Sequence, residues 1–188
     1  NEGIFEEPKE SEDAHRSGSS GSWRSSFIKA PYLRESFTRR GIIQDTFETA
    51  ITWDKSHKFI ENIKEETAKA ILEITGKPSL VTCRITHSYP DGLAPYFTFG
   101  AFSNPQSMMQ IWKEIKLATN EICIKNHGTV THHHAVGRDH RPKGYDDQRP
   151  DLFNKVLVAA KSSLDPKGIM NPGVLIDPEG KNISNWMA

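Results

Sequence analysis

Residues 80–102 read LVTCRITHSYPDGLAPYFTFGAF, and this stretch contains two runs rich in β-branched and aromatic side chains. The runs cover residues 80–87 and 94–102, and the sequence Tyr89-Pro90-Asp91-Gly92 joins them. Proline and glycine supply the backbone angles that a tight connection between antiparallel strands needs. The stretch therefore predicts a β-hairpin, which we expect to form the centre of the fold.

Helical patterns flank the hairpin on both sides. Between residues 54 and 75, apolar residues recur at spacings of three and four, which is typical of an amphipathic helix, and Gly76 and Pro78 are expected to end it. A second stripe follows Asn104-Pro105, a pair that suits a helix start. We expect this stripe to pack in the core, with an apolar ligand channel at its methionines as the alternative. The stripe consists of Met108, Ile111, Trp112, Ile115, Ala118 and Ile122.

Two extended segments complete the pattern. Residues 41–53 are rich in apolar residues with threonines between them, which favours a strand, and residues 129–134 suggest a fourth strand. The resulting order, βαββαβ, predicts an α+β fold of the ferredoxin-like type, in which both helices cover one face of an antiparallel four-stranded sheet. Residues 151–164 predict a further, C-terminal helix that stops before Pro166.

Composition divides the chain into three parts. Residues 1–30 are polar with a Ser/Gly cluster, and we expect a loop or linker there. Residues 31–134 are expected to form the ferredoxin-like domain, and residues 135–188 a loop, a helix and a tail. Because the chain begins at Asn1 with a sequence typical of an internal loop, we expect a fragment of a longer protein.

Charge and hydropathy exclude several classes of partner. Basic and acidic residues number 24 each, so no net field attracts nucleic acid. No apolar run is long enough to span a bilayer, and no signal peptide is visible. We expect a cytoplasmic protein, with peripheral contact to a membrane left open. Cys83 and Cys123 have no metal-type or redox-type spacing, which favours two reduced thiols.

Three consecutive histidines, His132, His133 and His134, are the candidate active-site element. Neutral imidazoles serve as acids, bases, hydrogen-bond donors or metal ligands near neutral pH. In a strand, His132 and His134 would share one side and His133 the other, so we expect one face to reach the substrate. A surface loop with incidental histidines is the alternative. His87 and His127 could add metal ligands, but no metal-type spacing supports them, and we expect no metal site.

Several motifs occur in the order found in the C-terminal half of the vanillyl-alcohol-oxidase type of flavoproteins. The segment SSLDPKGIMNPG is similar to the C-terminal signature of that superfamily. Within the superfamily, the chain resembles the alkylglycerone-phosphate synthase family, whose members are also called alkyldihydroxyacetonephosphate synthases. The resemblance extends from about residue 23 to residue 175 and rests on PYLRESF, IIQDTFETAITWDK, TCRITHSYPDG, APYFTF and THHHAVG.

The resemblance implies FAD as the cofactor and an exchange without net redox change. The acyl group of acyl-dihydroxyacetone phosphate would be replaced by a long-chain alcohol, a step of ether-lipid synthesis in which FAD acts as a covalent trap. The chain would be the substrate-cap part of such an enzyme with a flavin-contacting tail. It has no G-x-G-x-x-G or Walker sequence. An N-terminal FAD-binding domain of the same parent protein would therefore hold most of the flavin, this chain alone would be inactive, and homodimer formation stays open.

Site residues follow from the same resemblance. Tyr96 in APYFTF falls on the active-site tyrosine of the family, a proton-transfer candidate, and Arg34 in PYLRESF falls on an arginine that would bind the substrate phosphate. The histidine run would accept or deliver protons, with His133 and His134 next to the flavin ring. Asn171 in IMNPG would also contact the flavin. Each of these two residues also has a structural interpretation. Tyr96 could be an aromatic residue that packs on the sheet, and Arg34 could be a surface arginine at the start of a helix.

Two alternatives stay open. The 2-hydroxy-acid oxidases and dehydrogenases of the same superfamily carry H-x-G-D-G-N-x-H and S-G-E-H-G. Here residues 87–92, HSYPDG, lack the second histidine, and His133 stands at the place of the glutamate. A metal site of two histidines and a carboxylate would lose its anionic ligand, which disfavours an FAD-linked hydroxy-acid enzyme. The other alternative is a metal-binding ferredoxin-like module without enzymatic activity.

Overall fold

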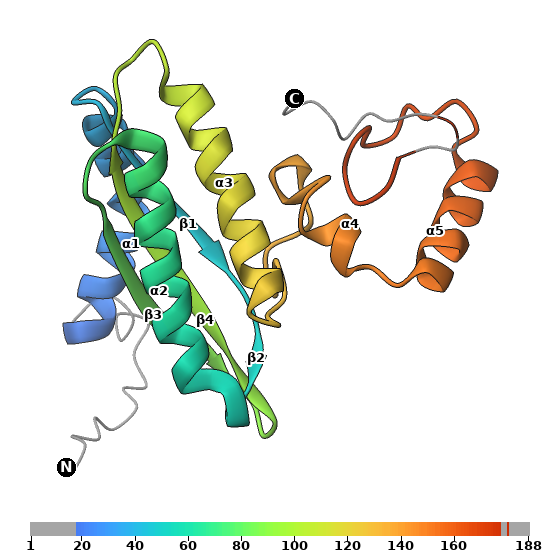
Figure 1. The fold of residues 1–188 in the computed structure, drawn as a ribbon, viewed down its shortest axis with the longest axis horizontal. Helices are drawn as coiled ribbons and strands as arrows, with labels where there is room; N and C mark the ends of the chain where they lie inside the picture. Colours follow the sequence, from blue (N-terminus) through green and yellow to red (C-terminus); the bar gives the residue numbers. More distant parts are fainter. Residues whose placement is uncertain (1–17, 178–179, 181–188) are drawn as a thin grey trace. The chain divides into compact units, whose positions relative to one another are not determined.

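The computed structural model describes residues 18–177 and residue 180, and Figure 1 shows their fold. The chain divides into two compact units, Asn1–Arg40 and Gly41–Ala188. The second unit thus begins at Gly41 rather than at residue 31, where composition places the domain boundary. Each unit is described by itself below.

The first unit contains the helix α1 (Gly18–Thr38). The loop expected over residues 18–30 is therefore wrong, and the rest of that expected loop, residues 1–17, lies outside the described residues. Pairs four positions apart stabilise this helix despite its serines and glycines. The rings of Trp23 and Phe27 stack at 5.4 Å, and Arg39 donates to the Glu35 carboxylate at 2.5 Å.

A four-stranded antiparallel sheet lies in the middle of the second unit (Figure 1). Its strands are β1 (Ile42–Glu48), β2 (Ile51–Thr52), β3 (Leu80–Ser88) and β4 (Gly92–Phe102). β4 is the central strand, because β3 pairs along one of its edges while β1 and β2 pair in succession along the other. The hairpin predicted for residues 80–102 is confirmed, and so is the α+β class with an antiparallel four-stranded sheet.

The fourth strand is not the segment that we expected. Residues 129–134 form no strand, and the short strand β2 lies beside β4 instead. β2 arises because the β-rich run of residues 41–53 breaks at Thr49 and Ala50. At this break the Ala50 amide donates to the Thr129 hydroxyl at 2.9 Å, and the Thr129 amide donates to the Ala50 carbonyl at 3.3 Å. The 129–134 segment therefore exchanges backbone hydrogen bonds only at this break and forms no ladder with the sheet.

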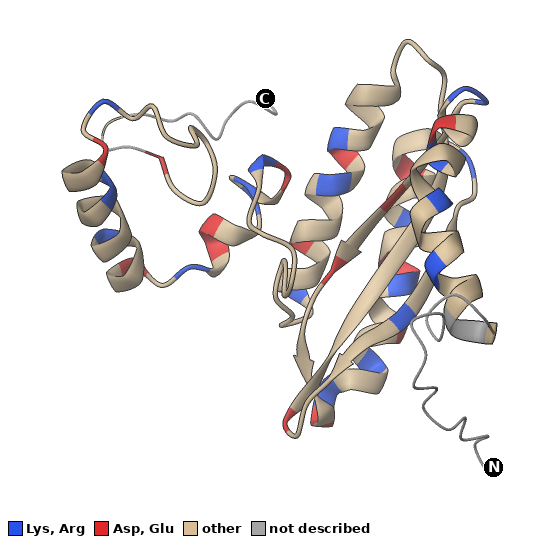
Figure 2. Cartoon of the chain, turned by 180° about the vertical axis from the view of Figure 1, so that it is seen from behind, with Lys and Arg blue, Asp and Glu red and all other residues tan. Residues whose placement is uncertain are grey.

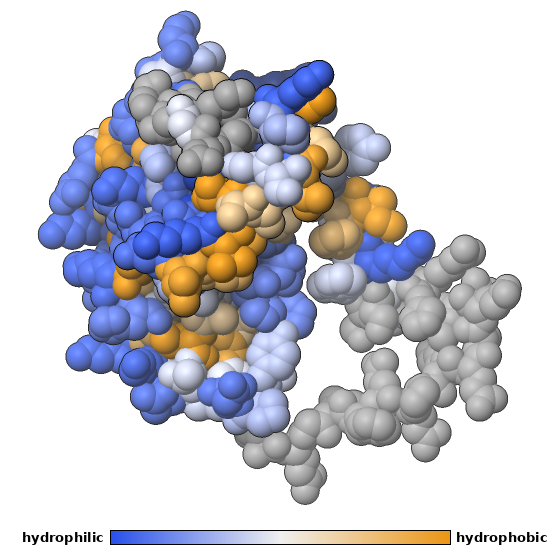
Figure 3. Space-filling view, turned by 90° about the vertical axis from the view of Figure 1, so that its right-hand side faces the viewer, coloured by the Kyte–Doolittle hydropathy of each residue, from blue (hydrophilic) through white to orange (hydrophobic). Residues whose placement is uncertain are grey.

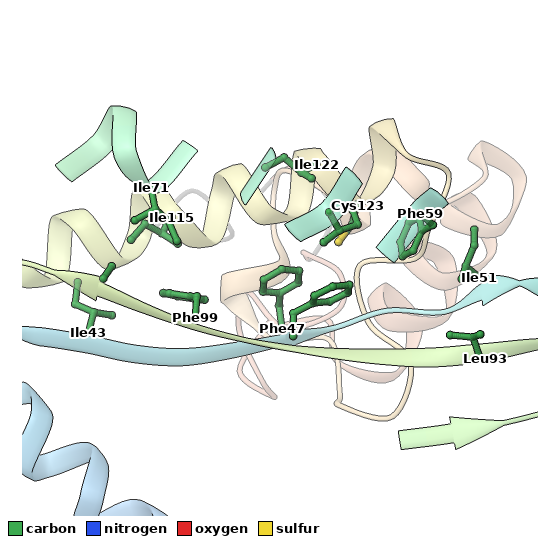
Figure 4. Close-up of a cluster of buried hydrophobic side chains, with 13 residues drawn as sticks. Ile43, Phe47, Ile51, Phe59, Ile71, Leu93, Phe99, Ile115, Ile122 and Cys123 are labelled. Atoms are coloured by element: carbon green, nitrogen blue, oxygen red, sulfur yellow. The ribbon is translucent and has the colours of Figure 1, made fainter. Parts of the chain in front are cut away.

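Two long helices, α2 (Trp53–Thr75) and α3 (Met108–Lys125), cover one face of the sheet, as predicted (Figures 1 and 4). α2 ends at Gly76, whose φ of 69° is left-handed and suits glycine. α3 begins three residues later than Asn104-Pro105, because the Asn104 side chain first accepts the Ser107 amide and closes a turn. Apolar side chains between these helices and the sheet form the core, and Figure 4 labels Ile43, Phe47, Ile51, Phe59, Ile71, Leu93, Phe99, Ile115, Ile122 and Cys123.

The C-terminal segment follows α3 with a 3-10 helix, η1 (Arg138–His140), the short helix α4 (Tyr145–Gln148) and α5 (Asp151–Leu164). α5 has the predicted bounds. Arg141 is 2% exposed and ties the segment together, since its guanidinium bonds the carboxylates of Asp146 and Asp177. Several apolar side chains of this segment are exposed. They include Leu152, Phe153, Val156, Leu164, Ile169 and Met170. Figure 3 shows the hydropathy of the molecular surface, with hydrophobic residues in orange.

Charged side chains of both signs are interspersed along the helices (Figure 2). Their distribution agrees with equal numbers of basic and acidic residues in the whole chain. Among the described residues, no helix combines the length and the apolar character that a bilayer crossing requires.

Candidate functional site

Successive residues of β4 project to opposite faces of the sheet. Phe97 and Phe99 are fully buried against the helices, so Tyr96 projects from the other face, which we call the site face. Glu48 of β1 and Arg84 of β3 lie opposite Tyr96 in the register of the sheet. These three side chains form a row across the site face, and the Arg84 guanidinium lies 4.5 Å from the centre of the Tyr96 ring.

A β-bulge places His87 on the site face. Ile85 pairs with Pro95 and His87 pairs with Ala94, so Thr86 is an extra residue in the ladder. In an uninterrupted ladder Thr86 would lie opposite Ala94, and His87 would project toward the helices. Bulges often direct a side chain in this way next to functional sites. His87 therefore shares a face with Tyr96 although nine residues separate them.

The carboxylate of Glu48 organises the site. Its side chain is 1% exposed, and its Oε1 atom accepts the backbone amides of His132, His133 and His134 at 2.6, 3.0 and 2.9 Å. The Thr131 hydroxyl donates to the same oxygen at 2.6 Å. Burial raises the pKa of Glu48, but the amide of His132 and the other donors outweigh it and hold the pKa below its usual value of 4.5. The buried carboxylate is thus an anion at neutral pH.

This arrangement corrects the expected geometry of the histidine run. An extended strand would direct His133 away from His132 and His134, but all three imidazoles lie around one carboxylate. The distances from Nδ1 to the nearer oxygen of Glu48 are 3.8, 3.1 and 3.9 Å for His132, His133 and His134. Three consecutive amides can converge on one oxygen only where the backbone curls, because the amides of a strand alternate in direction. The expected placement of His133 on the face opposite to His132 and His134 is therefore wrong.

Tyr96 lies beside two members of the run. Its ring is 5.9 Å from the His133 ring, at 28° to it, and 5.6 Å from the His134 ring, which it meets edge-on. Its hydroxyl donates to the Thr46 hydroxyl of β1 at 3.0 Å. The structure thus brings Tyr96 together with His133 and His134.

A second aromatic group borders the run. The Tyr89 hydroxyl lies 3.0 Å from Nε2 of His132. The His87 ring is 5.0 Å from the His132 ring and 4.8 Å from the His133 ring. Next to this group, a cavity of about 400 Å³ is lined by Lys55, Tyr89, Asp91, His127 and His132 among other residues. Its volume suits a small ligand.

The protonation state of His134 follows from its surroundings. Burial lowers the pKa of His134 below its usual 6.5, and the opposite effect of Glu48 is the smaller one. At neutral pH the imidazole is therefore uncharged, with one nitrogen that can accept a proton. Its side chain is 41% exposed, so that nitrogen is accessible to a bound molecule.

The two remaining predicted site residues lie elsewhere. Arg34 lies in α1 of the first unit, where its carbonyl accepts the Thr38 hydroxyl. Asn171 lies in the tail of the second unit with a φ of 46°, and its carbonyl accepts the Val174 amide. The tail is held to the segment that follows the histidine run, because Arg138 donates to the Pro172 carbonyl at 2.8 Å. Within the second unit, Asn171 is not among the residues that hydrogen-bond to Glu48.

The side chains of the site suit contact with a flavin ring. His133 and His134 are 31% and 41% exposed while the carboxylate beneath them is 1% exposed, so their polar edges face outward beside Tyr96. A flavin ring offers hydrogen-bonding atoms along its edge, which these edges match. The sequence has no glycine-rich motif of the kind that binds a dinucleotide pyrophosphate at a helix start.

Sequence reasoning missed Glu48. The only local signal is an acidic residue at the end of a β-rich run, IIQDTFE, and such residues are common at strand ends. Its function depends on pairing with β4 and on a loop more than 80 positions away. His87 was considered only as a metal ligand.

The chain is similar over most of its length to known flavoproteins. Residues 6–175 match the family described as FAD linked oxidases, C-terminal domain. FAD is the cofactor of this family.

Three curated relatives have the name alkyldihydroxyacetonephosphate synthase. The Caenorhabditis elegans protein is 32% identical over 78% of this chain, the Trypanosoma brucei brucei protein 29% over 82%, and the Dictyostelium discoideum protein 27% over 92%. The aligned part is 25% of the first two relatives and 30% of the third. The chain thus spans about a quarter to a third of their length.

Solved structures with the same enzyme name share the fold. One superposes on 80% of this chain with a TM-score of 0.55 and 22% sequence identity. The superposed part is 24% of the solved chain. A second gives a TM-score of 0.50 at 21% identity. Taken with the antiparallel sheet, the two covering helices and the match over residues 6–175, these similarities establish that the chain belongs to the family of C-terminal domains of FAD linked oxidases.

Proposed function

We propose that this chain is the substrate-cap part of an FAD-dependent enzyme of the alkylglycerone-phosphate synthase type. In the reaction, the acyl group of acyl-dihydroxyacetone phosphate would be exchanged for a long-chain alcohol. The observation that carries the proposal is the convergence of Tyr96, His133 and His134 on the site face around one buried carboxylate. The enzyme name of the three curated relatives supports the same reaction.

The exchange makes specific demands on the protein. The bond between the reacting carbon and the ester oxygen breaks, the acyl group leaves as a carboxylate, and the alcohol oxygen forms an ether bond to that carbon while the alcohol loses its proton. No net oxidation occurs. A proton also has to leave the reacting carbon and return, because this carbon is adjacent to a carbonyl. The site therefore needs a neutral base and a group that can return the proton.

His134 and Tyr96 match these two tasks. His134 is uncharged at neutral pH and partly exposed, so we assign to it the removal of the proton. The Tyr96 hydroxyl lies on the same face and can return a proton or stabilise negative charge on a substrate oxygen. His132 and His133 complete the polar surface against which the three-carbon headgroup would bind.

Binding of phosphate and cofactor falls to other residues. We assign the substrate phosphate to Arg34, whose guanidinium can form two parallel hydrogen bonds to phosphate oxygens. His133, His134 and Asn171 would contact the flavin ring. FAD supplies an electrophilic ring atom at which the three-carbon unit can be retained between departure of the acyl group and entry of the alcohol.

A second domain is needed to hold FAD. The exposed apolar side chains of α5 and of the tail, such as Phe153, Val156 and Met170, suit contact with such a domain. We therefore expect the isolated chain to be colourless after incubation with FAD and removal of free flavin, and to have no turnover. Retention of FAD at one equivalent would contradict this expectation.

The test uses the complete enzyme that carries this chain. Incubation with acyl-dihydroxyacetone phosphate and a labelled long-chain alcohol should release free fatty acid and incorporate label in equal amounts, with no net change in the flavin spectrum. Lasting reduction of the flavin by a 2-hydroxy acid, without incorporation of alcohol, would instead support a hydroxy-acid dehydrogenase and reject the exchange reaction.

A further inference from the structure

Three imidazoles meet at the histidine run, and a carboxylate borders two of them. His87, His132 and His133 each offer a ring nitrogen, and these three atoms lie within 4.8 Å of one another. Glu48 adds a carboxylate oxygen, Oε2, which lies 3.8 Å from Nδ1 of His132 and 3.1 Å from Nδ1 of His133. Three imidazoles and one carboxylate are a ligand set that zinc and similar divalent ions prefer.

The distances fit a tetrahedral ion. With metal–ligand bonds of 2.0–2.1 Å, two ligand atoms of a tetrahedral site are about 3.4 Å apart. Here Nδ1 of His132 and Nδ1 of His133 are 3.4 Å apart, and Oε2 of Glu48 lies 3.1 Å from the second and 3.8 Å from the first. These three atoms already form one face of a tetrahedron of the required size.

The carboxylate oxygen Oε2 accepts no hydrogen bond. Oε1 of Glu48 accepts all three backbone amides of the run, whereas Oε2 is buried, has no hydrogen-bond donor and lies 3.1 Å from Nδ1 of His133. The Glu48 side chain is 1% exposed, and an anionic oxygen buried without a hydrogen bond is costly. A bound cation between Oε2 and the imidazoles would compensate this charge.

Neighbouring residues form a hydrogen bond to one nitrogen of two of these rings, which leaves the other nitrogen free to bind a metal ion. The Thr86 hydroxyl donates to the Ala94 carbonyl at 3.1 Å, so it can only accept from Nδ1 of His87, which lies 3.1 Å away. The Nε2 atom of His87 then carries the free lone pair. Similarly, Nε2 of His132 can donate to the Tyr89 hydroxyl at 3.0 Å, which leaves Nδ1 of His132 for the ion.

We propose that Glu48, His87, His132 and His133 form a binding site for one divalent cation of the zinc class. The ion would bind the loop to strands β1 and β3, and it would leave His134 and Tyr96 for proton transfer. This site differs from our expectation of no metal. The histidine run has no carboxylate next to it in the sequence, but Glu48 of β1 brings one to it in the folded chain. The site shares His132 and His133 with the surface assigned to the headgroup, but metal binding requires no flavin and no substrate, so it can be measured independently of the proposed exchange reaction.

The test is a Zn²⁺ titration of the 188-residue chain after treatment with a chelator, in competition with a chromophoric chelator. We expect one tight equivalent. His87→Ala and Glu48→Gln should each weaken binding by at least about 100-fold, since each removes a direct ligand. His57→Ala is the matched control, because His57 lies on α2, is none of the four proposed ligands and has its Nδ1 atom 3.5 Å from the Glu61 carboxylate, and it should leave the affinity unchanged.

Two further results decide the proposal. Co²⁺ in place of Zn²⁺ should give the intense visible bands of a tetrahedral ion without a thiolate band, which would assign the ligands to imidazole and carboxylate. Circular dichroism establishes that each variant is folded, and His87→Ala leaves the Glu48 anchor of the loop intact. Absence of a tight equivalent in the folded chain, or unchanged affinity in His87→Ala, would overturn the site.

Discussion

Nδ1 of His133 lies 3.1 Å from Oε2 of Glu48, although the two residues are 85 positions apart in the chain. The contact joins the end of β1 to the loop that follows α3. Because Oε1 of the same carboxylate accepts three consecutive amides of that loop, one side chain determines both the backbone path of the histidine run and the directions of its rings.

Glu48→Ala should therefore destabilise the protein strongly. The substitution leaves three amides without their acceptor, while the Thr131 hydroxyl can still donate to the His134 carbonyl, and we expect the free energy of unfolding to fall by about 2–4 kcal/mol. Glu48→Gln keeps one acceptor oxygen and should lose less. Urea denaturation followed by circular dichroism measures both. Glu61→Ala is the control, since the Glu61 side chain is 61% exposed, and an equal loss in that variant would refute the anchoring role.

Tyr96→Phe should reduce turnover of the complete enzyme by about 100-fold or more if the phenol transfers a proton. The same substitution removes the hydrogen bond to Thr46, so Thr46→Val is the matched control, which deletes that bond but keeps the phenol. We expect the control to keep most of its activity and both variants to retain bound flavin. Similar activities of the two variants would assign Tyr96 a structural role.

Stability should decrease in mildly acidic solution because of His140. The Gly137 amide donates to Nδ1 of His140 at 2.9 Å, so this nitrogen must be unprotonated in the native state. Burial lowers the pKa of His140 below 6.5 despite the neighbouring Asp139. The unfolded chain therefore takes up the proton first, and the stabilisation present above pH 6.5 is lost as the pH falls from 6.5 toward the lower pKa of the native state.

The midpoint of urea denaturation, measured between about pH 7.5 and pH 5.5, tests this dependence above the range in which Glu48, with its ordinary pKa of 4.5, titrates in the unfolded chain. His140→Gln keeps an acceptor but cannot titrate, so its midpoint should fall less with decreasing pH than that of the unchanged protein. His57→Gln should leave the slope as it is. Equal slopes for His140→Gln and the unchanged protein would exclude this explanation.

Asp165→Asn should loosen the turn that leads to Asn171. The Asp165 carboxylate accepts Nζ of Lys161 at 2.7 Å and the amides of Ile169 and Met170 at 3.1 and 3.0 Å. The Lys161 hydrogen bond is the main reason that the pKa of Asp165 falls from 3.8 to about 2. The order that this carboxylate gives the turn is thus present above pH 3.8 and is lost as the pH falls toward 2.

Hydrogen exchange of the Ile169 and Met170 amides measures the effect of Asp165→Asn at neutral pH. At least one of them should exchange faster in the variant, because the two amides donate to different oxygens of Asp165 and an amide nitrogen replaces one of these oxygens. Asp151→Asn at the start of α5 is the control and should leave both amides as they are. Unchanged exchange in Asp165→Asn would show that the turn is held by other contacts.

Residue types identified part of the site in advance. Tyr96 and the histidine run were selected by their chemistry and by resemblance, and the structure places Tyr96 beside His133 and His134. Glu48 could not be selected, because its importance arises from its register with Tyr96 and from a loop far along the chain. The face of His87 was equally hidden, since it depends on the single extra residue Thr86 in the ladder.

The sequence by itself determined the hairpin, both covering helices and α5, because each is encoded by the spacing of apolar residues and by turn residues next to one another. It did not determine the path of residues 129–134. Their β-propensity is outweighed by a buried anion that draws three successive amides to one point, and α1 is likewise stabilised by pairs that composition did not reveal. Tertiary structure decided these features because a convergent set of hydrogen bonds to one carboxylate exists only after β1, β4 and the loop have come together.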